Sequence, residues 1–305
     1  MPISLLDLTH QQSVADFFAK EKPEYVFLAA AKVGGIHANN TYPAEFIHEN
    51  LAIQSNIIHQ SYLAGVIRLL FLGSSCIYPR NCPQPIKEEY LLTGPLEPTN
   101  RPYALAKIAG IEMCWSYNRQ YGTQFLAAMP TNLYGIGDNY HLENSHVIPA
   151  LIRKFHEAKE NHQHNVTVWG TGTPRREFLF SDDMAEACLF ILSLPDEEFK
   201  SLLASDRNDG LPPLMNLGSG KDISVAELAN LVKVVVGFEG EIIFDTSKPN
   251  GTLQKLMNVG LLKKLGWQYS VDLREGLALA YGDFKESIKV VNQAAIKVKY
   301  ETGQL

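Results

Sequence analysis

Short apolar runs alternate with longer segments of helical spacing through the first two thirds of the chain, and this alternation most constrains the fold. Residues 23–30, 67–72 and 124–129 read as strands. Residues 42–64 and about 102–121, which lie between them, carry apolar side chains at helical spacing. Strands that alternate with helices pair in parallel through right-handed crossovers. The pattern therefore predicts an α/β fold with a doubly wound, Rossmann-like parallel sheet.

The pattern loosens after about residue 138. Residues 166–172 read as a strand and a turn, and Asp182 opens a helix with an acidic first turn. Ser224 and Glu227 have the spacing of a capping box, which marks the start of another helix. We therefore expect a smaller α+β region for substrate binding over the ligand edge of the sheet.

Composition excludes several classes of protein. The chain has 305 residues, of which 46% are hydrophobic and 20% charged, with a formal net charge of -6. No block of lysine and arginine indicates a nucleic-acid surface. No apolar run approaches the roughly 18 residues of a membrane span, and the first residues do not resemble a signal peptide. We expect partners that are neither nucleic acids nor membranes.

The cysteines and histidines favour a reducing compartment without a metal site. The four cysteines form no CxxC pair, so reduced thiols and a cytoplasmic location are expected. Three histidines, at positions 156, 162 and 164, have no carboxylate or thiolate at ligand spacing. We therefore predict no metal.

Residues 69–79 read LLFLGSSCIYP, an apolar run followed by Gly73, two serines and Cys76. A buried hydroxyl needs a hydrogen-bond partner, so a hydrophobic core does not explain Ser74 and Ser75. Ligands bind at the C-terminal edge of a parallel sheet. The run therefore predicts a binding site where this strand ends.

Tyr103 and Lys107 are four residues apart and share one face of the predicted helix. A lysine cation near a phenol favours phenolate, which lowers the tyrosine pKa from about 10. Such a tyrosine can exchange a proton with a carbonyl or alcohol oxygen. By itself a YxxxK spacing is weak and is typical of a surface pair. Here Ser74 and residues 130–132 end neighbouring strands. These two strand ends and the Tyr103–Lys107 pair are therefore expected to converge on one crevice.

Several stretches of this chain resemble the extended short-chain dehydrogenase/reductase family. They are AAAKVGGIHANN (29–40), LGSSCIYP (72–79), EPTNRPYALAKIAG (97–110), PTNLYG (130–135), NSHVIPA (144–150), WGTGTPRRE (169–177) and FDTSKPNG (244–251). The resemblance spans residues 7 to about 285. SSCIYP together with NSHVIPA is similar to the branch of the family that epimerises and reduces a GDP-4-keto sugar.

The resemblance implies two reactions at one site: 3,5-epimerisation of GDP-4-keto-6-deoxy-D-mannose, then reduction of C4 with NADPH. The ketone acidifies the hydrogens on C3 and C5, so inversion needs one group to remove a proton and another to supply one. Cys76 and His146 are the implied pair, because each titrates near neutrality. Ser74 and Tyr103 would hold the C4 oxygen, and Lys107 would lower the Tyr103 pKa.

The resemblance also implies the residues that bind the two small molecules. Those for NADP(H) are Leu72, Gly73, Ser74, Ser75, Tyr103, Lys107, Pro130, Thr131, Asn132, Leu133 and His146. Lys154, Trp169 and Arg176 would bind the GDP-sugar. Lys154 stands where the family has an arginine, and an ammonium cannot bind a diphosphate bidentately. Arg175 is a candidate to compensate.

The same resemblance divides the chain into domains and implies an oligomer. Residues 1–137 and about 178–218 would form the NADP-binding domain, about 138–177 and 219–286 the substrate-binding domain, and 287–305 a C-terminal tail. A homodimer is expected, in which helices near 44–64 and 103–121 pair as a four-helix bundle.

The glycine-rich turn with which the family begins has no counterpart here. No GxxGxxG precedes Asp7, and residues 33–35 (VGG) follow a different strand end. That turn receives the cofactor pyrophosphate. We expect an N-terminally truncated Rossmann-like fold, and weaker NADPH binding by residues 1–305 than by a chain in which the unit is restored.

Other activities on this fold are less well supported. A dehydratase places an Asp-Glu pair where this chain has Cys76 and Ile77, and a simple 4-epimerase needs neither Cys76 nor His146. Two alternatives remain open. One is the same chemistry on a GDP-4-keto-3,6-dideoxy sugar, of the colitose type. The other is an inactive, truncated relative that serves only as a binding or oligomerisation subunit.

Overall fold

The principal sheet has four parallel strands in the order β1-β2-β3-β7. The computed structural model describes residues 6–141, 145–204, 212–248 and 250–301. The strands are β1 (Tyr25–Leu28), β2 (Arg68–Leu72), β3 (Phe125–Pro130) and β7 (Leu214–Leu217). The parallel register places the ends of β2 and β3 side by side, with Leu72 opposite Ala128. This arrangement confirms the doubly wound α/β fold.

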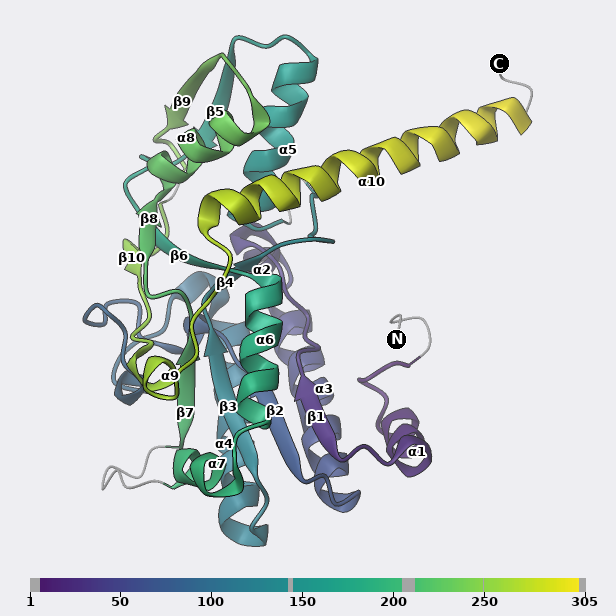
Figure 1. The fold of residues 1–305 in the computed structure, drawn as a ribbon, viewed down its shortest axis with the longest axis vertical. Helices are drawn as coiled ribbons and strands as arrows, with labels where there is room; N and C mark the ends of the chain where they lie inside the picture. Colours follow the sequence, from purple (N-terminus) through teal and green to yellow (C-terminus); the bar gives the residue numbers. More distant parts are fainter. Residues whose placement is uncertain (1–5, 142–144, 205–211, 249, 302–305) are drawn as a thin grey trace.

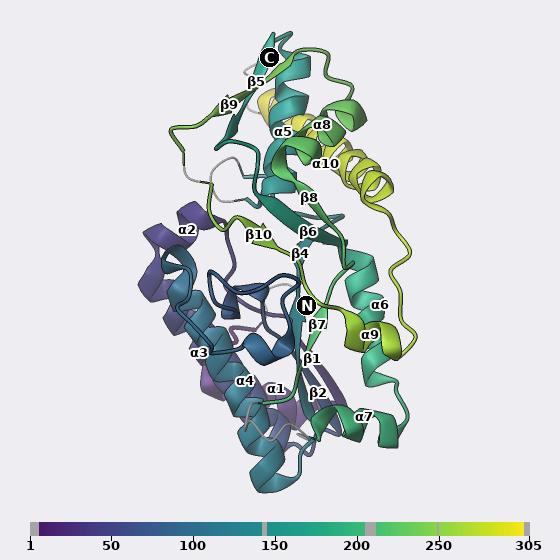
Figure 2. The same cartoon turned by 90° about the vertical axis from the view of Figure 1, so that its left-hand side faces the viewer.

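Helices cover both faces of this sheet, as Figure 2 shows with the sheet between them. On one face lie α1 (Gln11–Glu21), α3 (Pro43–Leu63) and α4 (Arg101–Tyr121). On the other lie α6 (Ser181–Leu192), α7 (Asp196–Leu203) and α9 (Gly260–Lys264). Because helices cover both faces, β2 is buried on both sides. Neighbouring side chains of a strand point in opposite directions, so Phe71 enters one core and Leu70 the other.

The sequence explains why α3 and α4 begin and end where they do. Each has a proline in its first turn, where the missing N–H costs no hydrogen bond. α4 ends at Gly122, which adopts the left-handed conformation (φ 69°) that suits glycine. Both helices follow the predicted ranges to within one residue, because proline and glycine mark their ends.

A second region lies beyond the carboxyl ends of the principal strands (Figure 1). Its strands are β4 (Asn132–Tyr134), β5 (Asn165–Trp169), β6 (Arg175–Phe180), β8 (Asp222–Ser224), β9 (Glu241–Asp245) and β10 (Gln254–Lys255). Its helices are α5 (Val147–Glu160), α8 (Val225–Val236) and α10 (Leu273–Glu301), whereas the short α2 (Ile36–Thr41) packs against α3 and residues 98–100. The predicted capping box at Ser224 and Glu227 is confirmed.

This region has a core of its own. Apolar side chains of α5, α8 and the first part of α10 pack against β5 and β6. α10 then continues to Glu301 and projects from the body of the molecule (Figure 1). Residues 287–301 of the expected tail therefore continue this helix. Within the part of the chain that the structure describes, no helix is long and apolar enough to cross a membrane.

Three short 3-10 helices line the junction between the two regions: Ser75–Ile77, Glu88–Tyr90 and Pro98–Asn100. The first directly follows β2, and the last directly precedes α4. The junction is therefore built from the chain that leaves the strand ends, which is where the predicted site residues lie.

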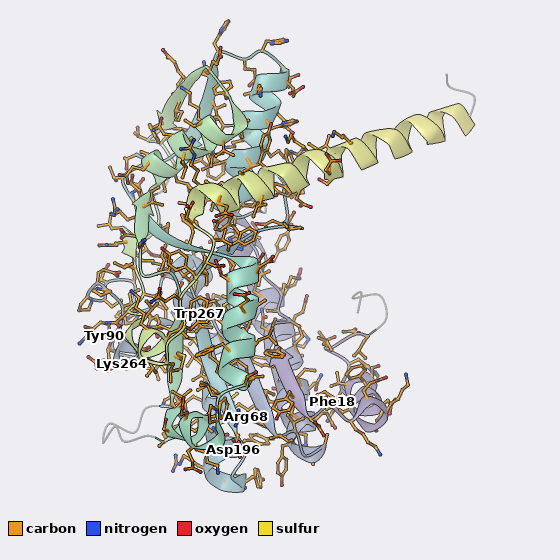
Figure 3. All side chains as sticks on the ribbon, viewed as in Figure 1. Phe18, Arg68, Tyr90, Asp196, Lys264 and Trp267 are labelled. Atoms are coloured by element: carbon orange, nitrogen blue, oxygen red, sulfur yellow. The ribbon has the colours of Figure 1, made fainter. Side chains whose placement is uncertain are left out.

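A buried arginine joins β2 to the segment that follows α6. Arg68 is 4% exposed, and its Nη1 donates hydrogen bonds to the carbonyl oxygens of Leu192 (2.8 Å) and Leu194 (2.6 Å). Its guanidinium lies 4.4 Å from the centre of the Phe199 ring and pairs with Asp196. Figure 3 labels Arg68 and Asp196 where α7 meets the base of the sheet. Arg68 thus satisfies carbonyls that the end of α6 leaves open.

We expect Arg68→Met to lower the free energy of unfolding by about 2–3 kcal/mol, because two buried carbonyls lose their donor. Asp196→Asn is the matched control. The Asp196 side chain is 71% exposed, so its charge should contribute less than about 1 kcal/mol. Urea unfolding measures both variants. Equal losses of unfolding free energy in the two variants would show that the ion pair, and not the hydrogen bonds to the carbonyls, provides the stability.

Candidate active site

The carboxyl end of β2 turns sharply into a short 3-10 helix that carries the predicted serine and thiol. Ser74 is the N-cap of this helix, and its Oγ accepts a hydrogen bond from the backbone N–H of Cys76 at 3.3 Å. Gly73 packs closely on β3: a Cβ there would lie 2.4 Å from the Met129 sulfur. The turn is therefore held against the end of β3.

Helix α4 is tied to the same strand end by Lys107. Its side chain is buried, and Nζ donates a hydrogen bond to the carbonyl oxygen of Leu72 at 2.8 Å. The ammonium lies 4.8 Å from the centre of the Phe71 ring and 5.8 Å from that of Tyr103. Burial lowers the pKa of Lys107 to about 8.

Tyr103, one turn before Lys107, is a neighbour of both Ser74 and Cys76. Burial raises the pKa of its phenol, the Cys76 sulfur raises it further, and a hydrogen bond with Ser74 opposes them. The expected lowering of the Tyr103 pKa is wrong for the structure, since desolvation of the phenol dominates. The phenol stays protonated and is suited to donate a proton.

The end of β3 serves mainly to join the two regions. Thr131 Oγ1 and Asn132 Nδ2 donate hydrogen bonds to the carbonyl oxygen of Glu177, at 3.1 and 2.8 Å. The carboxylate of Glu177 is fully buried and accepts hydrogen bonds from the N–H groups of Gly220 and Met257, both at 2.7 Å. Burial raises the pKa of this carboxyl to about 7, although the hydrogen bonds from those N–H groups lower it.

His146 begins helix α5, in the N-cap position. Part of its ring is exposed, yet the surrounding protein lowers the imidazole pKa more than nearby Asp138 raises it. Burial thus favours the neutral form of the imidazole. The structure brings Ser74, Cys76, Tyr103 and Lys107 together. Among the described residues no hydrogen bond joins His146 to Cys76. Of its NSHVIPA stretch, residue 144 lies outside the described residues.

Trp169 is an exposed ring flanked by two ammonium groups. Lys154 Nζ lies 5.6 Å and Lys248 Nζ 5.4 Å from the centre of its ring. Lys154 also donates a hydrogen bond to the carbonyl oxygen of Thr167 at 3.3 Å. A flat aromatic face beside two cations suits a nucleotide, which has a base to stack and phosphates to pair. Lys248 was missed by the sequence analysis, although it lies in the quoted stretch FDTSKPNG.

The two arginines of β6 face different surroundings. Arg176 is partly buried and near enough to Cys76 for the sulfur to raise its pKa, which burial lowers. Arg175 instead pairs with Asp222 at 2.9 Å and with Glu227 at 3.4 Å. These ion pairs give the suggestion that Arg175 compensates for Lys154 no support. Neighbouring strand side chains point to opposite faces, so only one of the two can face the site.

Two further residues reach the Cys76 sulfur. Asn100 Nδ2 donates a hydrogen bond to Sγ at 3.0 Å, and Lys255 Nζ lies 3.6 Å from it. Asn100 belongs to the quoted stretch EPTNRPYALAKIAG, where only Tyr103 and Lys107 were singled out. Lys255 is 179 residues from Cys76 in sequence, so no spacing signal could reveal it.

The described residues fit the nicotinamide end of a dinucleotide. Lys107 and Tyr103 offer an ammonium and a phenol, the pair that suits ribose hydroxyls and a reacting carbonyl oxygen. The ends of β2 and β3 meet beside them, at the edge of the sheet where dinucleotides bind. The chemistry of the donors and their place in the fold thus both suit NADP(H).

Comparisons with known proteins agree with this arrangement. Residues 2–202 match the model of the NAD dependent epimerase/dehydratase family. GDP-L-fucose synthase 1 of Arabidopsis thaliana is 56% identical over 283 residues, which are 93% of this chain and 83% of that protein. GDP-L-fucose synthase of Escherichia coli strain K12 is 52% identical over 282 residues, 92% of this chain and 86% of that protein.

A solved structure is similar as well. The GDP-mannoheptose C4 reductase of Campylobacter jejuni with NADP bound superposes with a TM-score of 0.83 at 42% sequence identity. The match covers 93% of this chain and 88% of that one. These similarities confirm the resemblance that the sequence motifs indicate.

The buried carboxyl of Glu177 should make stability depend on pH. Its pKa is raised from 4.5 to about 7, so the folded protein keeps a proton that the unfolded chain releases. Its contribution to stability is therefore largest below about pH 4.5 and falls by about 3 kcal/mol as the pH rises to about 7. Glu177→Gln cannot titrate and should lose this decline, whereas Glu241→Gln, at an exposed position, should keep it. Urea unfolding at pH 5 and 7.5 measures the difference, and parallel pH dependence in the wild type and Glu177→Gln would contradict the assignment.

Proposed function

The chain belongs to the NAD dependent epimerase/dehydratase family, and we propose from this membership that it is an NADP-dependent GDP-L-fucose synthase. The reaction converts GDP-4-keto-6-deoxy-D-mannose to GDP-L-fucose by 3,5-epimerisation and reduction at C4. The observation that carries the proposal is the thiol of Cys76 beside Tyr103 and Ser74. A reductase that did not epimerise would need the phenol but not the thiol.

Epimerisation needs the C4 carbonyl oxygen to carry negative charge for a moment. Ser74 and the protonated phenol of Tyr103 are suited to donate hydrogen bonds to that oxygen as an enolate forms. Cys76 and His146 act as the acid/base pair at C3 and C5. One removes a proton from the carbon, and the other supplies a proton on the opposite face. Burial favours the neutral form of the His146 ring, and a neutral imidazole can accept a proton.

Reduction uses the same oxygen. When bound, NADPH supplies the hydride that C4 receives. Tyr103 gives its proton to the C4 oxygen, and burial keeps that proton on the phenol until the oxygen becomes basic. Lys107, anchored on Leu72, holds its charge near the phenol and stabilises the phenolate that remains.

The nucleotide part of the substrate finds its partners in the second region. Trp169 offers an exposed face for stacking against the guanine base. Lys154 and Lys248 flank this ring, and Arg176 points toward the thiol side of the site. Two ammonium groups together can neutralise a diphosphate that a single arginine would bind bidentately. Lys248, rather than Arg175, thus compensates for Lys154.

The alternatives are less favoured. Relatives that are 52 to 56% identical over more than nine tenths of the chain carry the name GDP-L-fucose synthase. This level of identity favours the 6-deoxy sugar over a 3,6-dideoxy sugar, and an enzyme over a binding subunit.

A homodimer in the cytoplasm fits two further observations. The outward surface of α3 and α4 exposes Leu63, Leu105 and Tyr121, and the rings of Tyr62 and Tyr121 stack across the two helices at 4.2 Å. Such a surface supports pairing of the two helices with those of a second copy. All four cysteines are free thiols, which supports a reducing compartment.

The activity is tested with GDP-4-keto-6-deoxymannose and NADPH in deuterium oxide. Loss of nicotinamide absorbance reports reduction, and deuterium at C3 and C5 reports epimerisation. Cys76→Ser should slow deuterium incorporation about 100-fold or more, because a serine hydroxyl is a poor acid or base at neutral pH. Tyr103→Phe should abolish reduction to a similar degree while the substrate still binds.

Cys188→Ser is the matched thiol control, because Cys188 is buried in helix α6 on the far face of the sheet. It should incorporate deuterium at the wild-type rate. Full-rate incorporation by Cys76→Ser would remove the thiol from the mechanism. A wild-type protein that neither incorporates deuterium nor oxidises NADPH would overturn the proposed function itself.

The dimer is tested by size-exclusion chromatography with light scattering. We expect twice the chain mass of 34.0 kDa. Replacing Tyr121 with Lys should shift the protein toward the monomer, because it places a charge where an apolar contact is proposed. A wild-type mass of 34.0 kDa at micromolar concentration would contradict the pairing.

A further inference from the structure

The Cys76 sulfur has two nitrogen neighbours for which the proposed chemistry gives no role. Asn100 Nδ2 donates to Sγ at 3.0 Å, and Lys255 Nζ lies 3.6 Å from Sγ. The two come from different parts of the fold, one from the turn before α4 and one from strand β10. A thiol in the core of a protein needs neither neighbour, because a free cysteine there behaves as a small apolar side chain.

Asn100 makes this contact in place of a more usual one. It occupies the N-cap position of α4, where an asparagine normally accepts a hydrogen bond from the first turn and stabilises the helix by about 1 kcal/mol. Its side chain makes no such cap bond. Instead Nδ2 points to the sulfur, and Oδ1 is buried without a hydrogen-bond partner. The side chain therefore gives up local stability for its contact with Cys76.

Lys255 is held in place by the strand that carries it. β10 pairs with β6, with Lys255 opposite Arg176. The residues that follow are fixed from two sides: Leu256 N–H donates to Gln84 Oε1 at 2.8 Å, and Met257 N–H donates to the Glu177 carboxylate at 2.7 Å. The backbone is thus clamped between the second region and the loop that follows Cys76.

The charge of Lys255 is available to the sulfur. No carboxylate of the described chain lies within ion-pair distance of its ammonium, although eleven other ion pairs are present there. The other titratable groups near the thiol are Tyr103 on α4 and Arg176 on β6, and Cys82 also lies near Lys255. Of these, only Arg176 adds a second positive charge. Among the described residues, the charged groups near the sulfur, Lys255 and Arg176, are thus both positive.

We propose that Lys255 is a positioning residue for Cys76, its ammonium stabilising the thiolate while Asn100 fixes the direction of the sulfur. The proposal rests on the proposed function, in which Cys76 handles a proton of the sugar. When the thiolate removes a proton from the carbon beside the ketone, an S–H bond forms, the C–H bond breaks, and its electron pair moves onto the carbonyl oxygen. When the thiol supplies a proton instead, the same changes run in reverse. The sulfur is a thiolate on one side of either step, and Lys255 stabilises that form in both.

The pH dependence of alkylation at Cys76 tests this directly, and it does not require turnover. The full-length protein is treated with iodoacetamide from pH 5 to 10, and the peptide that contains Cys76 is followed by mass spectrometry, because only a thiolate reacts. Lys255→Met should move the midpoint of the rate upward by about one pH unit or more, since an opposite charge within about 4–6 Å shifts a pKa by 1–3 units. Lys255→Arg, which keeps the charge, should restore a midpoint near that of the wild type.

Lys264→Met is the matched control, because Lys264 is an exposed lysine on helix α9 (labelled in Figure 3). It should keep the wild-type midpoint, and urea unfolding confirms that each variant is folded. If Lys255→Met does not fold, Lys255→Gln provides the same loss of charge with a polar side chain. A wild-type midpoint in either folded variant would overturn the proposal.

Deuterium incorporation into the sugar provides the second readout. Lys255→Met should shift the pH profile of incorporation in the same direction as that of alkylation, whereas a merely structural loss would lower the rate equally at every pH. Failure of the proposed function is distinguishable: the wild type would then incorporate no deuterium while its thiol still responded to Lys255. A uniform loss of rate with an unchanged alkylation midpoint would assign Lys255 to structure alone.

Discussion

The hydrogen bond from Lys107 to the carbonyl oxygen of Leu72 is the contact on which the site depends. It joins helix α4 to the end of strand β2, and so sets the position of Tyr103 relative to Ser74 and Cys76. The donor is the ammonium of Lys107, which is only 2% exposed. An unpaired charge in such a buried position would be strongly unfavourable. The bond is therefore hard to lose, and the phenol, hydroxyl and thiol stay at one strand end without needing a ligand to gather them.

The second region contributes through a different buried group. Glu177 receives hydrogen bonds from the loops after β7 and β10, while its backbone carbonyl accepts two from the end of β3. One residue thus links the end of the principal sheet, beside which Cys76 lies, to strand β10, which carries Lys255. The strand of Glu177, β6, also carries Arg176, which lies near Cys76. We infer that the geometry around the thiol depends on both regions.

Periodicity predicted the main elements well, because α3, α4 and strands β1 to β3 have clear apolar patterns and proline or glycine at their ends. Ser74, Cys76, Tyr103 and Lys107 were predicted from short motifs whose members lie close together in sequence. Lys255 was not, because its contact with Cys76 spans 179 residues and depends on strand pairing. The direction of the Tyr103 pKa was wrong because spacing along a helix does not reveal burial, and burial dominates that pKa.

In the proposed mechanism one carbonyl oxygen serves both reactions, while a thiol and an imidazole act on the ring carbons beside it. A crystal structure of the Tyr103→Phe protein with NADP and the GDP-keto-sugar tests it most directly. We expect the C4 oxygen within hydrogen-bond distance of Ser74 Oγ, with the Cys76 sulfur and the His146 ring on opposite faces of the sugar. A sugar bound with both groups on one face, or with its C4 oxygen turned away from Ser74, would contradict it.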